Sequence, residues 1–216
     1  MSSSKVREAP DRLAATVKRT FDVALAGAGL IASAPLWGVF AAAIKLQDRG
    51  PIFYRQERSG RCGLHFDVLK FRSMIPDAEA GVGAMQASRS DPRVTTVGRF
   101  LRATALDELP QLWNILRGDM SFVGPRALRP GEIETLGTGG VERLEDVPGF
   151  AERSQVRPGL TGIAQIYAPR DIPRRLKFKY DLVYVRRQSL WLDLRLVLIS
   201  FWITLRGAWE VHGRKF

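Results

Sequence analysis

Two adjacent carboxylates, Asp107 and Glu108, are the residues of this sequence best placed to carry chemistry. They stand between Leu106 and Leu109 and precede Pro110, a residue that suits the first turn of a helix. A helix N-terminus favours negative charge and attracts phosphate groups, so we expect Asp107 to stay ionised beside a phosphate-binding site. Acidic residues in a first helical turn are more often only partners of the helix dipole, so the pair needs support from its surroundings.

Basic residues near glycine and proline turns provide that support. Arg99 and Arg102 lie one turn apart just before the carboxylates. The other basic candidates are Lys70, Arg72, Arg126 and Arg157. Any one of them alone is more often a solvated surface charge, but cations around such turns are the groups that hold a diphosphate. Together they favour a phosphorylated substrate.

The composition limits the classes of partner and cofactor. The chain has 216 residues, of which 45% are hydrophobic, and a net charge of +11, which suits one folded domain with an anionic partner. Nucleic acid, an acidic lipid surface and a phosphorylated substrate all stay open. The single cysteine, Cys62, excludes an internal disulfide framework and a multi-cysteine metal site. The two histidines, His65 and His212, argue against a histidine-built zinc or iron centre.

An apolar segment near the N-terminus indicates contact with a membrane. Residues 23–44 contain no charged residue and would form a helix of about 33 Å, enough to cross a bilayer. A spanning helix, a helix buried in a soluble core and a helix that enters and leaves on the same face are the alternatives. Basic residues flank the segment on both sides, and the positive-inside rule would place both flanks in the cytoplasm, which a single crossing cannot do.

The flanking charges together with Pro35 favour a re-entrant helix hairpin over residues 18–48, while a spanning helix and a buried core helix stay open as alternatives. The proline bends the helix, and each arm would then be roughly 15–20 Å long and reach about one leaflet. Pro35 also frees the carbonyl of Ile31, and we expect Ser33 or nearby backbone to help satisfy the polar groups of this kink.

The remaining elements are short. The pattern predicts strands at 52–54 and 66–69 around a turn at 59–63, a helix at 97–103 capped by Thr96, a helix from Pro110 to Gly118, a helix at about 174–187, and an apolar helix within 189–210. The last is interpreted as an interfacial helix with tryptophan anchors or, equally, as a core helix. Residues 130–150 are expected to form an exposed excursion.

The fold class is therefore α+β and mostly helical, with a small β-hairpin and interfacial amphipathic helices around the active site. We expect a polar, basic segment at 1–17, the re-entrant membrane helix at 18–48, and a catalytic domain at 49–216 that ends in the interfacial helix.

Several longer motifs occur in order along the chain. They are Lys-Arg-Thr-Phe-Asp at 18–22, Gly-Pro-Ile-Phe-Tyr-Arg-Gln-Glu-Arg at 50–58, Lys-Phe-Arg-Ser-Met at 70–74, Asp-Pro-Arg at 91–93, Leu-Asp-Glu-Leu-Pro-Gln at 106–111, Gly-Asp-Met-Ser at 118–121 and Arg-Pro-Gly-Leu-Thr-Gly at 157–162. With them the sequence resembles the bacterial sugar transferases, the monotopic polyprenyl-phosphate phosphoglycosyl transferases, from about residue 18 to residue 209. The length resembles that of the small, single-domain members, which lack further N-terminal membrane helices.

The resemblance implies a transferase of substituted phosphate groups that works by covalent catalysis. Asp107 would attack the sugar-proximal phosphorus of a UDP-sugar and expel UMP, and polyprenyl (undecaprenyl) phosphate would then displace the phosphosugar from the aspartate. Mg²⁺ would neutralise the diphosphate, held in part by Asp107, and Glu108 would assist by positioning or by proton management. The implied phosphate and nucleotide contacts are Lys70, Arg72, Arg102, Arg126 and Arg157.

The resemblance also implies partners and a location. The chain would bind a UDP-sugar, polyprenyl phosphate and membrane lipids, but no nucleic acid, at the cytoplasmic face of the bacterial inner membrane, as a monotopic protein. It would catalyse the first membrane step of polysaccharide or glycoconjugate synthesis, as in exopolysaccharide production. A homo-oligomer stays open. The rival hypotheses are an inactive membrane scaffold of the same fold, a basic nucleic-acid-binding protein, and a phosphotransferase whose carboxylate activates water.

Three places depart from the family pattern. Ala34, rather than serine, directly precedes Pro35. Ala127 stands where the family has the second proline of Pro-Arg-Pro, and Tyr-Ala-Pro-Arg at 167–170 replaces the usual Asn-Gly-Arg. The first departure bears on how the kink is stabilised, and the second weakens the expected nucleotide contact at this motif. The third either alters the preference for sugar or nucleotide or has no effect.

Overall fold

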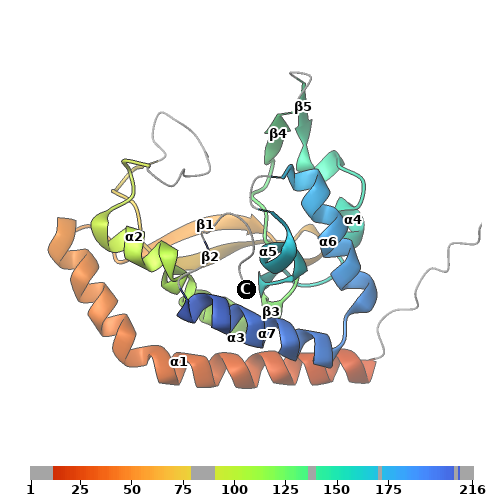
Figure 1. The fold of residues 1–216 in the computed structure, drawn as a ribbon, viewed down its shortest axis with the longest axis horizontal. Helices are drawn as coiled ribbons and strands as arrows, with labels where there is room; N and C mark the ends of the chain where they lie inside the picture. The colour runs from red at the N-terminus through yellow and green to blue at the C-terminus, as the bar shows by residue number, and fades with distance from the viewer. Residues whose placement is uncertain (1–11, 79–90, 136–139, 170–171, 207–208, 210–216) are drawn as a thin grey trace, which may run out of the picture.

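The computed structural model describes residues 12–78, 91–135, 140–169, 172–206 and 209. Within these residues the fold is α+β and mostly helical, with small two-stranded sheets, as predicted (Figure 1). The α-helices are α1 Arg12–Asp48, α2 Thr96–Ala103, α3 Gln111–Arg117, α4 Phe150–Arg153, α5 Ile163–Tyr167, α6 Arg174–Arg187 and α7 Leu190–Leu205. The 3-10 helices are η1 Arg61–Gly63, η2 Leu106–Glu108 and η3 Leu144–Asp146. The strands are β1 Phe53–Ser59, β2 His65–Phe71, β3 Ser121–Val123, β4 Ile133–Thr135, β5 Val141–Arg143 and β6 Gly159–Thr161.

Helix α1 runs along the lower edge of the molecule and bends once before its C-terminal arm (Figure 1). Pro35 lies inside this helix, and a proline removes one helical hydrogen bond and displaces a carbonyl, so we attribute the bend to it. The hydroxyl of Ser33 donates to the carbonyl of Leu30 at 3.5 Å and accepts from the indole of Trp37 at 3.1 Å. Ser33 is thus bound within the kink, although to Leu30 rather than to the freed carbonyl of Ile31.

Helix α1 differs from the predicted segment in its extent and continuity. It begins at Arg12, six residues before the expected start, and is one bent helix rather than two helices joined by a turn. Residues 1–11 of the predicted polar segment lie outside the described residues. Among the described helices, α1 is the one long and apolar enough to cross a membrane, and Ile31 and Leu46 are 80% and 85% exposed. The re-entrant path stays a prediction.

Strands β1 and β2 form the predicted antiparallel hairpin, with both strands longer than expected. Phe53 pairs with Phe71 and Ser59 with His65, and the turn between them contains left-handed backbone at Cys62 (φ 55°). The rings of Phe71, Phe53 and Trp37 contact one another: the centroid of Phe71 lies 5.5 Å from that of Phe53 and 5.4 Å from that of Trp37, and the last two are 5.8 Å apart. This aromatic cluster attaches the C-terminal arm of α1 to the hairpin.

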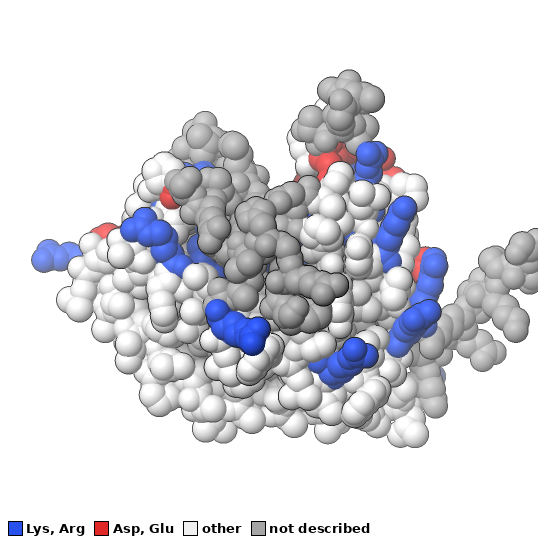
Figure 2. All heavy atoms as spheres, viewed as in Figure 1, with Lys and Arg blue, Asp and Glu red and all other residues white. Residues whose placement is uncertain are grey.

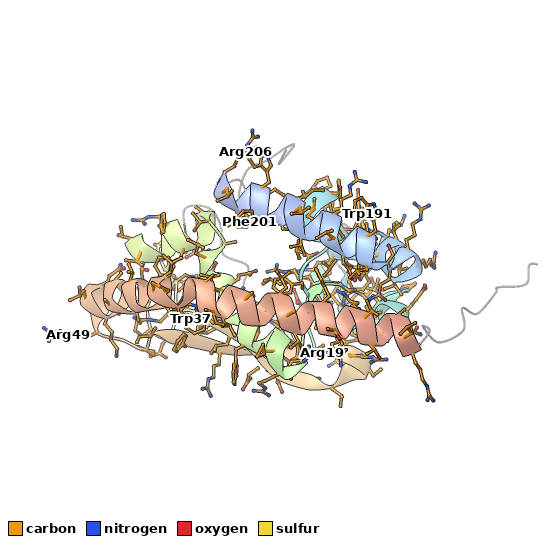
Figure 3. All side chains as sticks on the ribbon, turned by 90° about the horizontal axis from the view of Figure 1, so that it is seen from below. Arg19, Trp37, Arg49, Trp191, Phe201 and Arg206 are labelled. Atoms are coloured by element: carbon orange, nitrogen blue, oxygen red, sulfur yellow. The ribbon has the colours of Figure 1, made fainter. Side chains whose placement is uncertain are left out.

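Helix α3 packs along α1 in the main hydrophobic core. Ala26 and Ile115 are fully buried there. A side chain at Gly29 would lie 3.1 Å from Leu112, so the glycine permits the close approach of the two helices. The guanidinium of Arg19, labelled in Figure 3, donates to the carbonyls of Ile115 and Leu116 at 2.6 and 2.7 Å, at the C-terminal end of α3. Helix α3 is therefore fixed to α1 both along its side and at its end.

A buried polar network joins the N-terminal arm of α1 to β3, α6 and α7. The carboxylate of Asp22 accepts the hydroxyl of Ser121 at 3.0 Å. The ammonium of Lys18 pairs with Asp193 at 2.7 Å, and the hydroxyl of Tyr184 donates to the same carboxylate at 2.8 Å. Because buried polar groups need partners, this network explains structurally why Lys18 and Asp22 occur before the apolar segment.

Helix α7 has one buried and one exposed apolar face. Leu196 and Ile203 are fully buried, whereas Trp191 is 75% exposed. Ser189 caps the helix by accepting the N–H of Leu192. This pattern suits a helix that lies on the protein and faces a membrane, but the interfacial position stays a prediction.

The described residues of the segment 130–150 are partly exposed and partly buried. Strands β4 and β5 form an antiparallel hairpin on which Ile133 and Val141 are exposed. Leu144 and Val147, in contrast, are buried against Phe178 of α6. The expectation of an exposed excursion is therefore wrong for Leu144 and Val147, whereas Glu145, Asp146 and Pro148 are exposed.

Candidate active site

Asp107 lies on η2, a single 3-10 turn between α2 and α3. Ala105 before it adopts left-handed backbone (φ 56°), and Leu106 and Leu109 on either side pack onto the aromatic cluster. These apolar anchors hold the carboxylate in a fixed, buried position, with 8% of Asp107 exposed. The predicted placement in the first turn of the helix is wrong, because α3 begins only at Gln111.

The two carboxylates have different electrostatic environments. Lys70 on β2 forms an ion pair with Glu108. Burial raises the pKa of Asp107 to about 6, although the nearby cations of Lys70, Arg102 and Arg126 oppose the shift. The pKa of Glu108 is lowered, because Lys70 and Arg126 outweigh the effect of burial. With a pKa of about 6, Asp107 is still mostly ionised at pH 7, as expected, but the cations around it rather than a helix N-terminus favour the charged form.

Asp107 lines a large cleft of about 2350 Å³ that has a cationic and an apolar part. The cationic part includes Arg58, Lys70, Arg72, Arg102, Arg126, Arg129, Arg174 and Lys177. The apolar part includes Leu25, Gly29, Ala32 and Leu36 of α1 together with Val197 and Phe201 of α7. Figure 3 shows α1 and α7 together on the lower side of the molecule, with Phe201 on α7. The cleft thus joins a surface suited to phosphates to one suited to a hydrocarbon chain.

Arg102 and Arg126 are brought to the carboxylates as predicted. Arg102 lies on α2 and Arg126 follows β3, and both line the cleft beside Asp107. Each acts electrostatically on Asp107, in the direction that favours its ionised form. Guanidinium groups in such positions can bind the oxygens of a phosphate.

Arg72 and Arg157 have other main contacts. Arg72 lines the cleft but is only 6% exposed. Its guanidinium pairs with Asp48 at the end of α1. Its Nε and Nη1 atoms are buried and have no hydrogen-bond partner among the described residues. Arg157 donates its Nε to the carbonyl of Gly118 at 2.8 Å, at the far end of α3 from Asp107, and is not among the described residues that line the cleft. The structure therefore does not bring Arg157 to the predicted site.

Arg58 is a site residue that the sequence analysis treated only as part of a motif and of a basic flank. Its guanidinium donates to the carbonyl of Ala127 at 3.2 Å, and it lines a small pocket together with Lys70, Glu108 and Arg126. Burial lowers the pKa of Arg58 to about 10, with a contribution from Arg126. Arg58 pairs with Phe66 on β2, two positions from Val68 and four from Lys70, so it lies on the same face of the hairpin as Lys70. Strand periodicity combined with the hairpin register would have identified it.

The donor set fits a magnesium ion that is shared with a substrate. Among the described residues no three His, Cys, Asp or Glu side chains form a metal-binding group. Asp107 makes no hydrogen bond or ion pair to another described residue, so its oxygens are available. Mg²⁺ in proteins commonly takes one or two carboxylates plus waters and substrate phosphates, which a single free carboxylate in an anion-binding cleft can satisfy.

Comparisons with known proteins place these features in a family context. The model of the family "Bacterial sugar transferase" matches residues 13–207. The chain is 43% identical over 190 residues to the undecaprenyl-phosphate glucose phosphotransferase of Komagataeibacter xylinus, covering 85% of this chain and 35% of that protein. It is 43% identical over 186 residues to the UDP-glucose:undecaprenyl-phosphate glucose-1-phosphate transferase of Caulobacter vibrioides, covering 84% of this chain and 67% of that protein. It is 39% identical over 186 residues to the exopolysaccharide production protein PSS of Rhizobium leguminosarum bv. phaseoli, covering 84% of this chain and 91% of that protein. The chain thus spans about a third of the first relative and most of the third.

Proposed function

The chain belongs to the bacterial sugar transferase family, and from this premise we propose that it transfers a sugar 1-phosphate from a UDP-sugar to polyprenyl phosphate and releases UMP. The observation that carries the proposal is the position of Asp107, buried without an ion-pair partner among the described residues, in a cleft with a cationic and an apolar part. The names of two relatives include UDP-glucose or glucose, so UDP-glucose is the first donor to test, and undecaprenyl phosphate is the first acceptor.

The proposed reaction has two displacements at one phosphorus atom. In the first, a carboxylate oxygen of Asp107 bonds to the sugar-bearing phosphorus, while the bond from that phosphorus to the bridging oxygen breaks and UMP leaves with the electron pair. In the second, an oxygen of the lipid phosphate bonds to the same phosphorus, and the bond to Asp107 breaks. The products are the lipid diphosphosugar and the free carboxylate.

The residues around Asp107 would act mainly by charge and position. Phosphoryl transfer depends mostly on neutralising and aligning the phosphates, and Lys70, Arg102 and Arg126 supply cations for this. Glu108 would hold the Lys70 ammonium beside the reacting group through their ion pair. Magnesium, when bound, would supply further neutralisation of the diphosphate, and Asp107 would hold it in part.

We further propose that the chain is monotopic at the cytoplasmic face of the bacterial inner membrane. In this arrangement α1 enters and leaves the same leaflet, α7 lies at the interface, and residues 49–216 face the cytoplasm. The exposed apolar residues of α1 and α7 support this, as does the lower edge of the molecule, where the face in view carries no coloured charged side chain (Figure 2). The lipid acceptor would then reach the cleft from the side of α1 and α7.

Release of UMP is the direct test. A panel of UDP-sugars, with UDP-glucose first, is incubated with the full chain in lipid nanodiscs, with and without undecaprenyl phosphate. We expect steady UMP release with lipid and, without lipid, a burst limited to one equivalent, which is the signature of the covalent intermediate. An inactive scaffold of the same fold would release no UMP with any donor, and that result would overturn the proposal.

A further inference from the structure

Residues 124–128 are held by four consecutive carbonyl groups. The carbonyl of Pro125 accepts the N–H of Gly159 at 2.9 Å, and that of Leu128 accepts the N–H of Ser59 at 2.8 Å. Between them, the carbonyl of Arg126 accepts from the guanidinium of Arg153 at 2.6 Å, and the carbonyl of Ala127 accepts from that of Arg58. Two backbone bonds and two arginine side chains therefore fix this segment.

Only one side chain of this segment is exposed. Residues 124, 125, 127 and 128 are buried, whereas Arg126 is exposed and lines the cleft beside Asp107 and Glu108. The main chain at Arg126 thus sets the direction in which its guanidinium reaches the carboxylates.

Arg153 is itself oriented by a buried ion pair. Its Nε lies 2.9 Å from the carboxylate of Asp181, and the two side chains are only 5% and 4% exposed. Its guanidinium also lies over the ring of Phe178, 4.7 Å from the centroid. These contacts come from α4 and α6 and leave the Nη2 atom of Arg153 directed at the carbonyl of Arg126.

The buried ion pair of Arg153 and Asp181 is not needed for the stability of the fold alone. Taking two charges out of water commonly costs as much as their mutual attraction returns, and an apolar pair of similar volume is often as stable. The orientation of the Arg126 carbonyl is a benefit that an apolar pair would not provide.

We propose that Arg153, oriented by Asp181, is a positioning residue that aims the Arg126 guanidinium at the Asp107–Glu108 pair and at the anionic substrate bound there. This inference rests on the proposed transferase function. Arg153 also lines the cleft, but its guanidinium is engaged by Asp181, by the ring of Phe178 and by the carbonyl of Arg126, and in this proposal it acts through Arg126.

The test replaces the ion pair by apolar side chains and follows the coupling to Arg126. Because removing one charge alone would leave the other buried and unpaired, the variant is Arg153→Met with Asp181→Val. We expect its melting temperature to match or exceed that of the unaltered chain, while kcat/KM for the UDP-sugar falls about tenfold and KM for undecaprenyl phosphate stays the same. In an Arg126→Ala background the same replacement should cause no further loss.

A matched control exists on the same two helices. Arg186 of α6 and Glu152 of α4 form an ion pair that is more exposed than that of Arg153 and Asp181 and is separate from the four bonds described above that hold residues 124–128. Arg186→Met should leave kcat and both KM values unchanged.

Two results would overturn the inference. One is unaltered donor kinetics in the Arg153/Asp181 variant, and the other is an equal loss in the Arg126→Ala background, which would indicate a general structural role. Calorimetric binding of UDP with Mg²⁺ gives a readout that needs no turnover. A chain that binds UDP but releases no UMP would contradict the proposed transfer reaction. The ratios of UDP affinity among these variants would still decide the role of Arg153.

Discussion

The ammonium of Lys70 pairs with Glu108, while the adjacent carboxylate of Asp107 makes no hydrogen bond or ion pair within the described part of the chain. A nucleophile needs a free electron pair, and a carboxylate that is tightly bonded to a cation is less able to supply one. The arrangement therefore assigns the two acidic residues different tasks: Glu108 holds the cation, and Asp107 stays available for attack.

Asp107→Asn should abolish turnover without affecting membrane association. An amide cannot form the proposed acyl phosphate, so we expect UMP release to fall by about a thousandfold or more. Glu108→Gln should retain measurable activity, because Asp107 is still present, although Lys70 loses its partner. UMP release and flotation with lipid vesicles measure the two properties, and near-normal turnover of Asp107→Asn would remove the nucleophile assignment.

Asp107→Asn should also stabilise the metal-free protein at neutral pH. The pKa of Asp107 is about 6 in the folded chain, above the ordinary value of 3.8, so the folded state binds this proton more tightly than the unfolded state. Its contribution to stability therefore falls as the pH rises from about 4 to 6, and the ionised group costs up to about 3 kcal/mol above that range. Thermal unfolding in EDTA should show a higher melting temperature for Asp107→Asn at pH 7.5, and a difference that narrows toward pH 4. Asp67→Asn, at an exposed position on β2, is the control, and a difference independent of pH would contradict the assignment.

Chelation should stop the reaction without unfolding the chain. Since no group of three metal-binding side chains occurs among the described residues, we expect Mg²⁺ alone to bind weakly and to bind more tightly once a diphosphate is present. Calorimetry of Mg²⁺ with and without UDP checks this order. Tight binding of Mg²⁺ to the free protein would instead point to a site made by the protein alone.

Gly98→Ala should destabilise the fold and lower activity. A Cβ atom at Gly98 would lie 1.9 Å from the carbonyl oxygen of Ser73, so α2, which carries Arg102, must move. We expect a loss of about 2 kcal/mol or more in unfolding free energy, measured by denaturant titration. Gly38→Ala is the matched control, because a Cβ there meets nothing within 4 Å, and alanine should favour the helix by roughly 0.5–1 kcal/mol.

Labelling from the two sides of the membrane can test the path of α1. Cys62 is exposed on the hairpin turn and is the natural thiol of the chain. A second thiol is introduced as Ala14→Cys in a Cys62→Ser background, at an exposed position near the start of α1. A membrane-impermeant maleimide should reach both positions only after the inner membrane is opened. Labelling of one position from outside intact spheroplasts would show that α1 crosses the bilayer.

Local sequence signals predicted two helices and the β-hairpin. Helix α6 occupies the predicted residues, and α3 ends at Gly118, whose φ of 99° only glycine adopts easily. The predicted β-hairpin is confirmed. It could be predicted because its turn and its apolar residues are close in sequence. The cap of α2 was wrong by one residue, since Thr95 rather than Thr96 accepts the N–H of Gly98.

Contacts between distant segments were beyond the reach of the sequence. Arg58 was not assigned to the site, and Arg157 was assigned to it although it does not line the described cleft, because the position of each guanidinium depends on which carbonyl it meets after folding. The raised pKa of Asp107 could not be predicted for the same reason, because it depends on how deeply folding buries the carboxylate. Of the stretch 167–170, which departs from the family pattern, Arg170 lies outside the described residues.

The attachment of α3 to α1 has a consequence for how bilayer and chemistry are linked. Arg19 donates to carbonyls at the C-terminal end of α3, and Gly29 allows α3 to pack closely along α1. Asp107 lies just before the N-terminal end of α3. With α1 in one leaflet, as proposed above, the depth of that helix sets the distance between the Asp107 carboxylate and the hydrocarbon region of the bilayer. The thickness of the bilayer would then affect the rate at which a lipid phosphate reacts with the nucleotide-derived phosphosugar.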